Sequence, residues 1–145
     1  MRVFVLNGPN LDLLGRREPE MYGRATLADV EKLCRERAIE LGMEIEFRQT
    51  NDEAEMIGWL HEAIERADAI VINPAAWTHY SLALREALAA ANVPVVEVHI
   101  TNIYAREEWR AKSVVSGVAR AVISGLGIRG YAAALDGVSD MLNAD

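Results

Sequence analysis

Side chains suited to proton transfer and to anion binding follow three apolar segments of the sequence. Arg17 and Tyr22 stand in a glycine-bounded loop after the first segment, whereas His79 follows the second and His99 the third. Histidine changes charge near neutral pH, and arginine holds anions through paired hydrogen bonds. These residue types suit acid–base chemistry on an anionic small molecule. The polar stretches are Asn7–Leu11 with Gly15–Gly23, Asn73–His79, and His99–Asn102 with Arg106–Arg110.

Alternating strands and helices separate these stretches. Arg2–Asn7 is almost entirely apolar, which is typical of a parallel strand covered on both faces. Thr26 with Asp29 has the form of a capping box and predicts a helix that Gly42 ends. Further strands are predicted at Met43–Arg48, Ala69–Ile72, Val95–Val98 and Val118–Ser124, further helices at Asp52–Arg66, Ser81–Ala91 and Tyr131–Leu142, and an irregular stretch with a helical turn at Thr101–Ser116.

This alternation predicts right-handed βαβ units and an α/β fold. We expect a flavodoxin-like, doubly wound, five-stranded parallel sheet in the order 2-1-3-4-5, formed by residues 1–145 as one domain. In that order a ligand binds beyond the carboxyl ends of strands 1 and 3. The three polar stretches are therefore expected to meet at one rim of the sheet.

Composition excludes several classes of protein. The chain has 145 residues, a formal net charge of −7 and 51% apolar residues, which argues against disorder and against a basic nucleic-acid surface. No apolar run approaches the roughly 20 residues that cross a bilayer, and the start of the chain does not have the form of a secretory signal. Cys34 is the only cysteine, so it has no disulfide partner within the chain. We expect a cytoplasmic protein without nucleic-acid or membrane partners.

Motifs for nucleotides and metals are missing or weak. The sequence has no phosphate-binding loop with its lysine, and the first loop lacks the hydroxyl groups of a flavin phosphate site. His61, His79 and His99 do not have metal-ligand spacing, so no metal is predicted. Gly125–Gly130 matches G-x-G-x-x-G, but no second strand follows to carry a ribose-binding acid, so we interpret this segment as a turn.

Long motifs of a known family recur in fixed order at Asn7–Leu11, Leu14–Pro19, Tyr22–Gly23, Asn73–Pro74 with Thr78–His79, Glu97–Ile100, and Asn102 with Ala105–Glu108. The chain resembles the type II 3-dehydroquinate dehydratase family nearly from end to end. The resemblance implies anti elimination of water from 3-dehydroquinate, through an enolate, to give 3-dehydroshikimate. It also implies a reaction without metal or organic cofactor, and a homododecamer built as a tetramer of trimers.

The resemblance assigns the catalytic roles. Tyr22 matches the base that removes a proton beside the ketone, and Arg17 matches the arginine that activates this base. Ionising a tyrosine of ordinary pKa, about 10, costs about 4 kcal/mol at pH 7, and a nearby guanidinium lowers that cost. Asn10 matches the residue that holds a water near the enolate oxygen. His99 matches the acid for the departing hydroxyl, and Glu97, on the same strand face, is expected to orient its ring.

The same resemblance assigns the substrate contacts. Asn73, His79 and Arg110 match side chains that bind ring hydroxyls. The backbone N–H groups of Ile100 and Thr101 match the site of the substrate carboxylate.

Two further features concern the loops. Arg106 matches a residue that positions the loop or the site, and Gly15–Gly23 is expected to close as a lid over the bound ring. The two lysines, Lys32 and Lys112, match no catalytic role. This argues against the Schiff-base route of the unrelated type I enzymes.

The chain departs from the family pattern at several positions. Glu86 takes the place of an aspartate that reaches the active site of a neighbouring subunit, and its extra methylene changes that reach. Thr101 replaces the usual serine and keeps a hydroxyl. Ala75 stands where glycine is common, and Gly117 stands where proline is usual.

Two other functions stay open at this point: a flavodoxin-like redox protein, and a homologue that binds the anion without turning it over. Flavin absorbance of the purified protein would favour the first. Binding without formation of an enone would favour the second. The sequence does not distinguish aromatic biosynthesis from quinate breakdown, because both use the same step.

Overall fold

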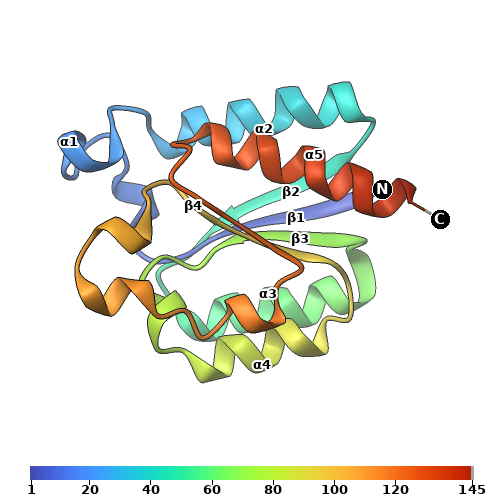
Figure 1. Cartoon of the computed structure of the whole chain (residues 1–145). Helices are drawn as coiled ribbons and strands as arrows, with labels where there is room; N and C mark the ends of the chain where they lie inside the picture. Colours follow the sequence, from blue (N-terminus) through green and yellow to red (C-terminus); the bar gives the residue numbers. More distant parts are fainter. Residues whose placement is uncertain (145) are drawn as a thin grey trace.

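The computed structural model describes residues 1–144 and contains a parallel sheet with helices on both faces (Figure 1). The strands are β1 (Arg2–Asn7), β2 (Glu44–Gln49), β3 (Ala69–Asn73), β4 (Val95–His99) and β5 (Ala121–Ser124), paired in the order β2-β1-β3-β4-β5. The helices are α1 (Pro19–Tyr22), α2 (Leu27–Leu41), α3 (Glu53–Arg66), α4 (Leu82–Ala90) and α5 (Arg129–Asn143), with 3-10 turns η1 (Leu11–Leu13), η2 (Ala75–His79), η3 (Ile103–Ala105), η4 (Glu108–Ala111) and η5 (Ser116–Val118). The predicted fold class and strand order are confirmed.

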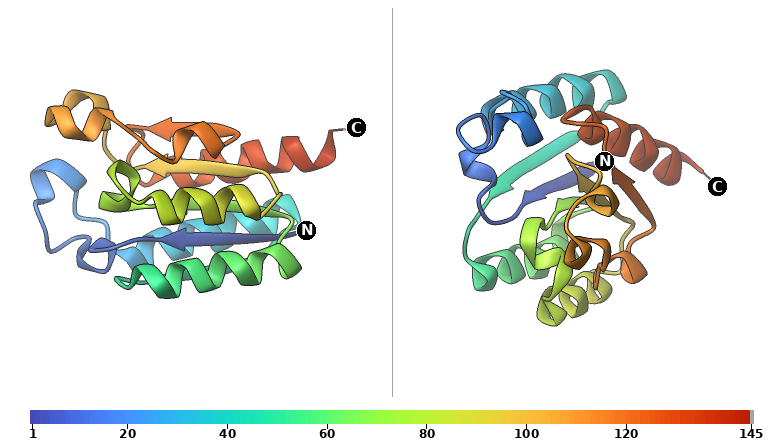
Figure 2. Two further views of the ribbon diagram at one scale, coloured as in Figure 1. Left: turned by 90° about the horizontal axis from the view of Figure 1, so that it is seen from below. Right: turned by 60° about the vertical axis from the view of Figure 1, so that its left-hand side comes forward.

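Each face of the sheet is covered by a pair of helices. Helices α2 and α5 pack together on one face, and α3 and α4 pack together on the other (Figures 1 and 2). Successive side chains of a strand point to opposite faces, so β1 contributes Val5 to the core under α2 and α5, and Phe4 to the core over α3 and α4. Strands β3 and β4 are buried along their whole length, as expected for a doubly covered parallel sheet.

Local sequence patterns determine the helix ends. Thr26 and Asp29 form the predicted capping box, in which the Asp29 N–H donates to Thr26 Oγ1 at 3.2 Å and the Thr26 N–H donates to Asp29 Oδ2 at 2.9 Å. Asp52 and Ser81 cap α3 and α4 with their side-chain oxygens. Gly42 ends α2 in the left-handed region at φ 70°, where glycine carries no steric cost.

Strand β5 is shorter than predicted, because it covers Ala121–Ser124 and not Val118–Ser124. The residues before it form the 3-10 turn Ser116–Val118. Ser113 Oγ accepts two backbone N–H groups at the start of this turn, at 3.0 and 3.2 Å, and so favours the turn over an extended chain. The other predicted strands and helices match the observed ones to within two residues at each end.

The predicted loop Gly15–Gly23 contains the one-turn helix α1, which sequence analysis missed. Proline at the first helical position, here Pro19, favours such a start. Gly15 and Gly23 bound the segment at φ 85° and 78°. A Cβ at Gly15 would also lie 3.0 Å from a backbone oxygen, so this position requires glycine. The loop folds back and packs Tyr22 against the core under α2 and α5.

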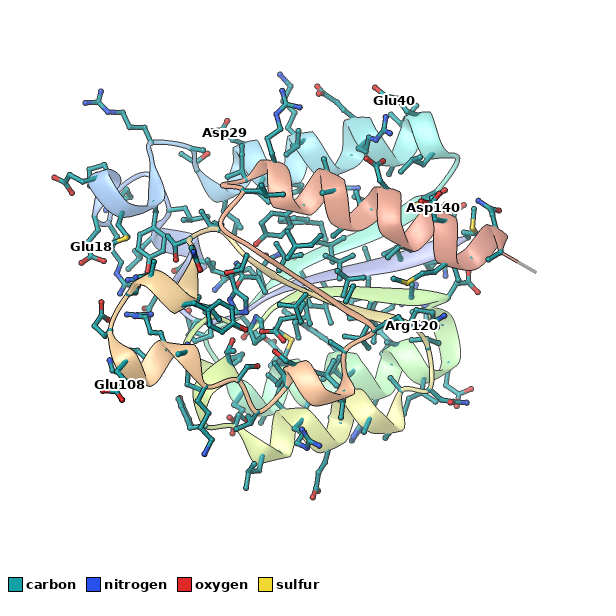
Figure 3. The ribbon with its side chains drawn as sticks, in the orientation of Figure 1. Glu18, Asp29, Glu40, Glu108, Arg120 and Asp140 are labelled. Atoms are coloured by element: carbon teal, nitrogen blue, oxygen red, sulfur yellow. The ribbon has the colours of Figure 1, made fainter. Side chains whose placement is uncertain are left out.

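The carboxyl ends of the strands lie together at one end of the molecule. Asn7 and Asn73 are register partners on β1 and β3. In Figure 3, Glu18 and Glu108 mark this end, whereas Asp140 lies toward the opposite end. The polar stretches that follow β1, β3 and β4 therefore meet at one rim, as predicted.

Candidate active site

A cavity of about 340 Å³ opens at this rim, a volume typical of small-molecule sites. Three arginines and two histidines line it, and no lining residue in the described part of the chain is acidic. In a protein with a net charge of −7, this local excess of cations favours an anionic ligand. The predicted site residues on the cavity wall are Asn10, Arg17, Tyr22, Asn73, His79, His99, Ile100, Thr101, Arg106 and Arg110.

Tyr22 ends α1 with its hydroxyl beside an arginine. Arg106 Nη1 donates a hydrogen bond to the Tyr22 hydroxyl oxygen at 2.8 Å. The guanidinium carbon of Arg106 lies 5.1 Å from the centre of the Tyr22 ring, and that of Arg17 lies 5.7 Å from it. Arg106 therefore contacts the Tyr22 oxygen itself, whereas Arg17 lies near the ring, and the assignment of Tyr22 as a base stays a prediction.

Arg106 is the more firmly held of these two arginines. Its side chain is 7% exposed, and Nη1 also donates to Thr101 Oγ1 at 3.1 Å. The Arg17 side chain is 42% exposed and lies 3.7 Å from the Glu18 carboxylate. Sequence analysis assigns Arg106 a supporting role only, because nothing in the spacing joins it to a tyrosine 84 residues earlier. The structure brings it directly onto the Tyr22 hydroxyl, and the activating role of Arg17 stays a prediction.

His99 and Glu97 lie two residues apart on β4 and point to the same side. Glu97 Oε2 is hydrogen-bonded to His99 Nε2, and both side chains are buried, at 0% and 5% exposed. Ser116 Oγ donates to Glu97 Oε1 at 2.6 Å, and Ser113 Oγ donates to Glu97 Oε2 at 3.3 Å. These donors keep the carboxylate aligned on the imidazole. The ring nitrogen left for a bound ligand is His99 Nδ1.

Sequence analysis missed the two serines of this cluster. They lie in the irregular segment that follows the site loops, and nothing in its pattern marks them as partners of a buried acid. A buried carboxylate requires donors, so the prediction of Glu97 beside His99 already implied such groups without identifying them.

His79 lies in η2 and is held by a backbone oxygen and an aromatic edge. Its Nδ1 lies 2.7 Å from the Lys112 carbonyl oxygen, which can only accept, so Nδ1 carries the hydrogen. Its ring packs edge to face with Trp109, with centroids 5.1 Å apart. Burial lowers the pKa of His79, and this outweighs the opposing effect of the bond to Lys112. The neutral ring therefore offers the lone pair of Nε2 as an acceptor.

Arg110 lies beside this histidine at the cavity wall. Its Nε donates to Glu107 Oε2 at 2.6 Å, and its guanidinium carbon lies 4.1 Å above the Trp109 ring. The side chain is 15% exposed. An ion pair and an aromatic face thus fix the orientation of its remaining N–H donors.

Asn10 adopts a left-handed conformation at φ 70°, which asparagine tolerates better than most residues. Its backbone N–H donates to Asn51 Oδ1 at 2.8 Å, and Gln49 Nε2 donates to the same oxygen at 3.1 Å. The sequence predicts no site residue in the segment after β2. The side chains of Gln49 and Asn51 nevertheless hold the loop that carries Asn10.

Glu86 does not line the cavity of its own chain. It lies exposed on α4. The changed reach of Glu86, relative to the aspartate that it replaces, toward the site of a neighbouring subunit stays a prediction.

Comparison with known proteins decides the family. The family model described as "Dehydroquinase class II" matches residues 1–139. The chain belongs to the class II dehydroquinase family. A 3-dehydroquinate dehydratase of Salinispora tropica is 57% identical over 135 residues, which cover 93% of this chain and 94% of that protein. 3-Dehydroquinate dehydratase 2 of Pseudomonas putida is 53% identical over 140 residues, which cover 97% of this chain and 94% of that protein. The crystal structure of a type II dehydroquinase from Propionibacterium acnes matches with a TM-score of 0.92 and 48% identity, and 95% of each chain is covered.

Two departures from the class II dehydroquinase pattern have structural correlates. Ala75 adopts a left-handed conformation at φ 52°, which is strained for a residue with a Cβ atom and explains a preference for glycine. At Gly117, a Cβ would lie 3.1 Å from Arg85 Nη1, and this guanidinium donates to the Val114 carbonyl at 2.7 Å. Arg85 thus occupies the space beside Gly117 that a larger residue would need.

No helix within residues 1–144 is both long and apolar enough to cross a membrane. Nor do three or more histidine, cysteine, aspartate or glutamate side chains gather there into a group that could hold a metal ion. The expectation of a metal-free reaction stays a prediction.

Proposed function

We propose that this protein is a 3-dehydroquinate dehydratase, a hydro-lyase that converts 3-dehydroquinate to 3-dehydroshikimate and water. The observation that carries the proposal is the composition of one cationic cavity. It holds a tyrosine hydroxyl bonded to Arg106 and a histidine bonded to the buried Glu97. The dehydratases of Salinispora tropica and Pseudomonas putida, both more than half identical to this chain, support the choice of substrate.

Tyr22 acts as the base in the first step. Its phenolate oxygen takes a proton from the carbon beside the ketone, and the electrons of that C–H bond form the enolate. Arg106 and Arg17 stabilise the phenolate before the transfer. Asn10 holds a water that donates to the enolate oxygen, so neutral dipoles fixed in advance stabilise the developing charge.

His99 acts as the acid in the second step. The enolate collapses, the C–O bond breaks with its electron pair on oxygen, and imidazolium Nδ1 protonates the departing hydroxyl to give water. Glu97 stabilises the imidazolium through Nε2, and the two serines hold Glu97 in place. Exchange with solvent then removes the proton from Tyr22 and restores the proton of His99, so the enzyme returns to its starting state.

Side chains around the ring fix its orientation. Asn73, His79 and Arg110 bind the ring hydroxyls. His79 accepts through Nε2, whereas Arg110 donates. The substrate carboxylate binds at the backbone N–H groups of Ile100 and Thr101. The Thr101 hydroxyl accepts from Arg106, so its own hydrogen is free to reach the carboxylate.

The loop Gly15–Gly23 acts as a lid. Tyr22 is the last residue of α1, and Arg17 lies just before this helix. The loop begins and ends at glycines with positive φ. Closure excludes water from the ring, which strengthens the interactions between charges inside the site.

The whole chain works as one catalytic domain, within a homododecamer arranged as a tetramer of trimers. Glu86, exposed on α4, replaces the aspartate that in the family reaches a neighbouring active site, and its extra methylene changes that reach. The single, buried Cys34 fits function in the reducing cytoplasm.

A direct assay tests this proposal. Purified protein is mixed with 3-dehydroquinate, and the ultraviolet absorbance of the conjugated enone is followed. We expect steady formation of the enone, unaffected by a metal chelator or by borohydride. Loss of activity with chelator would refute the metal-free route, and inactivation by borohydride with substrate would indicate an imine. Binding without enone formation would indicate an inactive homologue, and flavin absorbance of the purified protein would favour a redox role.

A further inference from the structure

A buried tyrosine joins the ends of two central strands behind the cavity wall. Tyr131 lies in the first turn of α5 and is 0% exposed. Its hydroxyl donates to Asn7 Oδ1 at 2.7 Å and accepts from Asn73 Nδ2 at 3.0 Å. Asn7 and Asn73 are register partners at the carboxyl ends of β1 and β3. Of these three residues, only Asn73 lines the cavity of the described chain.

Backbone groups at both ends set the direction of this hydrogen-bond chain. At one end, Asn7 Nδ2 donates to the Arg48 carbonyl at 3.0 Å, so Asn7 turns its oxygen toward Tyr131. At the other end, the Ala75 N–H donates to Asn73 Oδ1 at 3.1 Å, so Asn73 turns its NH₂ group toward Tyr131. A carbonyl can only accept and an N–H can only donate. The Tyr131 hydroxyl fits between the two amides because it does both.

The direction of this series of hydrogen bonds determines which groups Asn73 presents to a ligand. An amide has two N–H donors and two oxygen lone pairs. One donor of Asn73 is bonded to Tyr131 and one lone pair to Ala75. The second donor and the second lone pair remain for the cavity. A flipped amide would set its carbonyl oxygen against Tyr131 and its NH₂ against the Ala75 N–H, which loses both bonds.

Tyr131 is also suited to remain a donor. Burial raises the pKa of its phenol, so the hydroxyl keeps its hydrogen wherever the protein is folded at ordinary pH. The chain of bonds therefore keeps one direction.

We propose that Tyr131 is a positioning residue that fixes the amide of Asn73, so that one N–H and one lone pair face the hydroxyl groups of the bound ring. Because a hydroxyl both donates and accepts, a vicinal pair of hydroxyls matches this surface. The inference rests on the proposed function for the nature of the ring. It does not rest on it for the orientation of the amide.

Kinetics of Tyr131→Phe test the consequence for the substrate. We expect KM to rise on the order of tenfold, because a misoriented Asn73 amide loses about one hydrogen bond to the substrate. We expect kcat to stay within about threefold of wild type. The control is Tyr104→Phe, which removes a hydroxyl from an exposed tyrosine outside the cavity and should leave both constants unchanged. An unchanged KM in Tyr131→Phe would overturn the proposal.

A double mutant separates positioning from a general loosening of the core. If Tyr131 acts through Asn73, then Tyr131→Phe adds no further rise in KM to the Asn73→Ala variant. A rise of the same size in both backgrounds would contradict the proposal, since Tyr131 would then act by another path.

Neutron diffraction of the wild-type protein tests the orientation without any variant or substrate. We expect the deuterium of Tyr131 to point at Asn7 Oδ1, and one deuterium of Asn73 Nδ2 to point at the Tyr131 oxygen. Asn73 with its carbonyl toward Tyr131 would overturn the inference even if Tyr131→Phe fails to fold. Wild-type protein that shows this orientation but no turnover would refute the proposed function and leave the positioning role standing.

Discussion

Replacing Glu97 with glutamine tests how the acid of the proposed reaction is prepared. The carboxylate is 0% exposed and bonded to His99 Nε2, with Ser113 and Ser116 donating to it. Glu97→Gln keeps the size of the side chain and removes its charge. The introduced amide oxygen can still accept from the serines, which leaves its NH₂ group facing His99. Two donors then meet whenever His99 is an imidazolium.

The size of the effect follows from the bond that is lost. A hydrogen bond to a charged group contributes about 1.5–3 kcal/mol. Each 1.4 kcal/mol corresponds to a factor of about ten, so turnover at neutral pH is expected to fall about 10- to 100-fold. The free energy of unfolding is expected to change little, because Glu97→Gln also removes the cost of burying a charge.

The assay follows enone absorbance at saturating substrate, with melting temperature measured in parallel. Ser116→Ala provides a graded comparison, since it removes the 2.6 Å bond to Glu97 and keeps the charge. We expect its turnover to lie between those of wild type and Glu97→Gln. A Glu97→Gln protein that turns over within about threefold of wild type would refute the role of the pair in preparing His99.

Two further predictions concern stability. Arg48 and then Arg66 lower the pKa of Glu62 from an ordinary 4.5 to about 2. The resulting stability is fully present above pH 4.5 and is lost as the pH falls toward 2. After allowance for 33% exposure, Glu62→Gln should therefore lower the free energy of unfolding by about 1 kcal/mol at pH 7 and by nothing near pH 2, as denaturant titrations at both pH values would show. Ala75→Gly removes left-handed backbone strain of about 1–2 kcal/mol from the folded state. It also adds conformational entropy to the unfolded chain, which costs about 0.5–1 kcal/mol, so the melting temperature should rise by about 1–4 °C. Ala76→Gly, in the same turn without positive φ, should lower the melting temperature. Equal effects of the two glycines would refute the strain argument.

The sheet was predictable because most of its strands have an unambiguous local pattern. Arg2–Asn7 and Ala69–Ile72 are apolar runs bounded by turn residues, and Thr26 with Asp29 identifies a helix start by its own chemistry. The start of β5 was not predictable in this way. The apolar Val118 fits a strand, but the hydroxyl of Ser113 stabilises a turn there, and a periodicity of side chains does not detect that bond.

The site was predictable as a set of loops and less so as a set of contacts. The order of the sheet brings the segments after β1, β3 and β4 together, and this follows from topology alone. The bond between Arg106 and Tyr22 depends on how the loop Gly15–Gly23 folds back to bring Tyr22 onto Arg106, which spacing along the chain does not encode. The same holds for Asn51 under Asn10 and for Tyr131 behind Asn73.

Substrate binding and turnover of Tyr22→Phe test the central claim most directly. This variant removes only the oxygen that is bonded to Arg106, and the ring that packs against the core remains. Calorimetric titration with 3-dehydroquinate should give a Kd within about threefold of wild type, whereas turnover should fall about 10²- to 10⁴-fold, the usual contribution of a general base. Normal turnover by Tyr22→Phe, with binding intact, would contradict the assignment of this phenolate as the base.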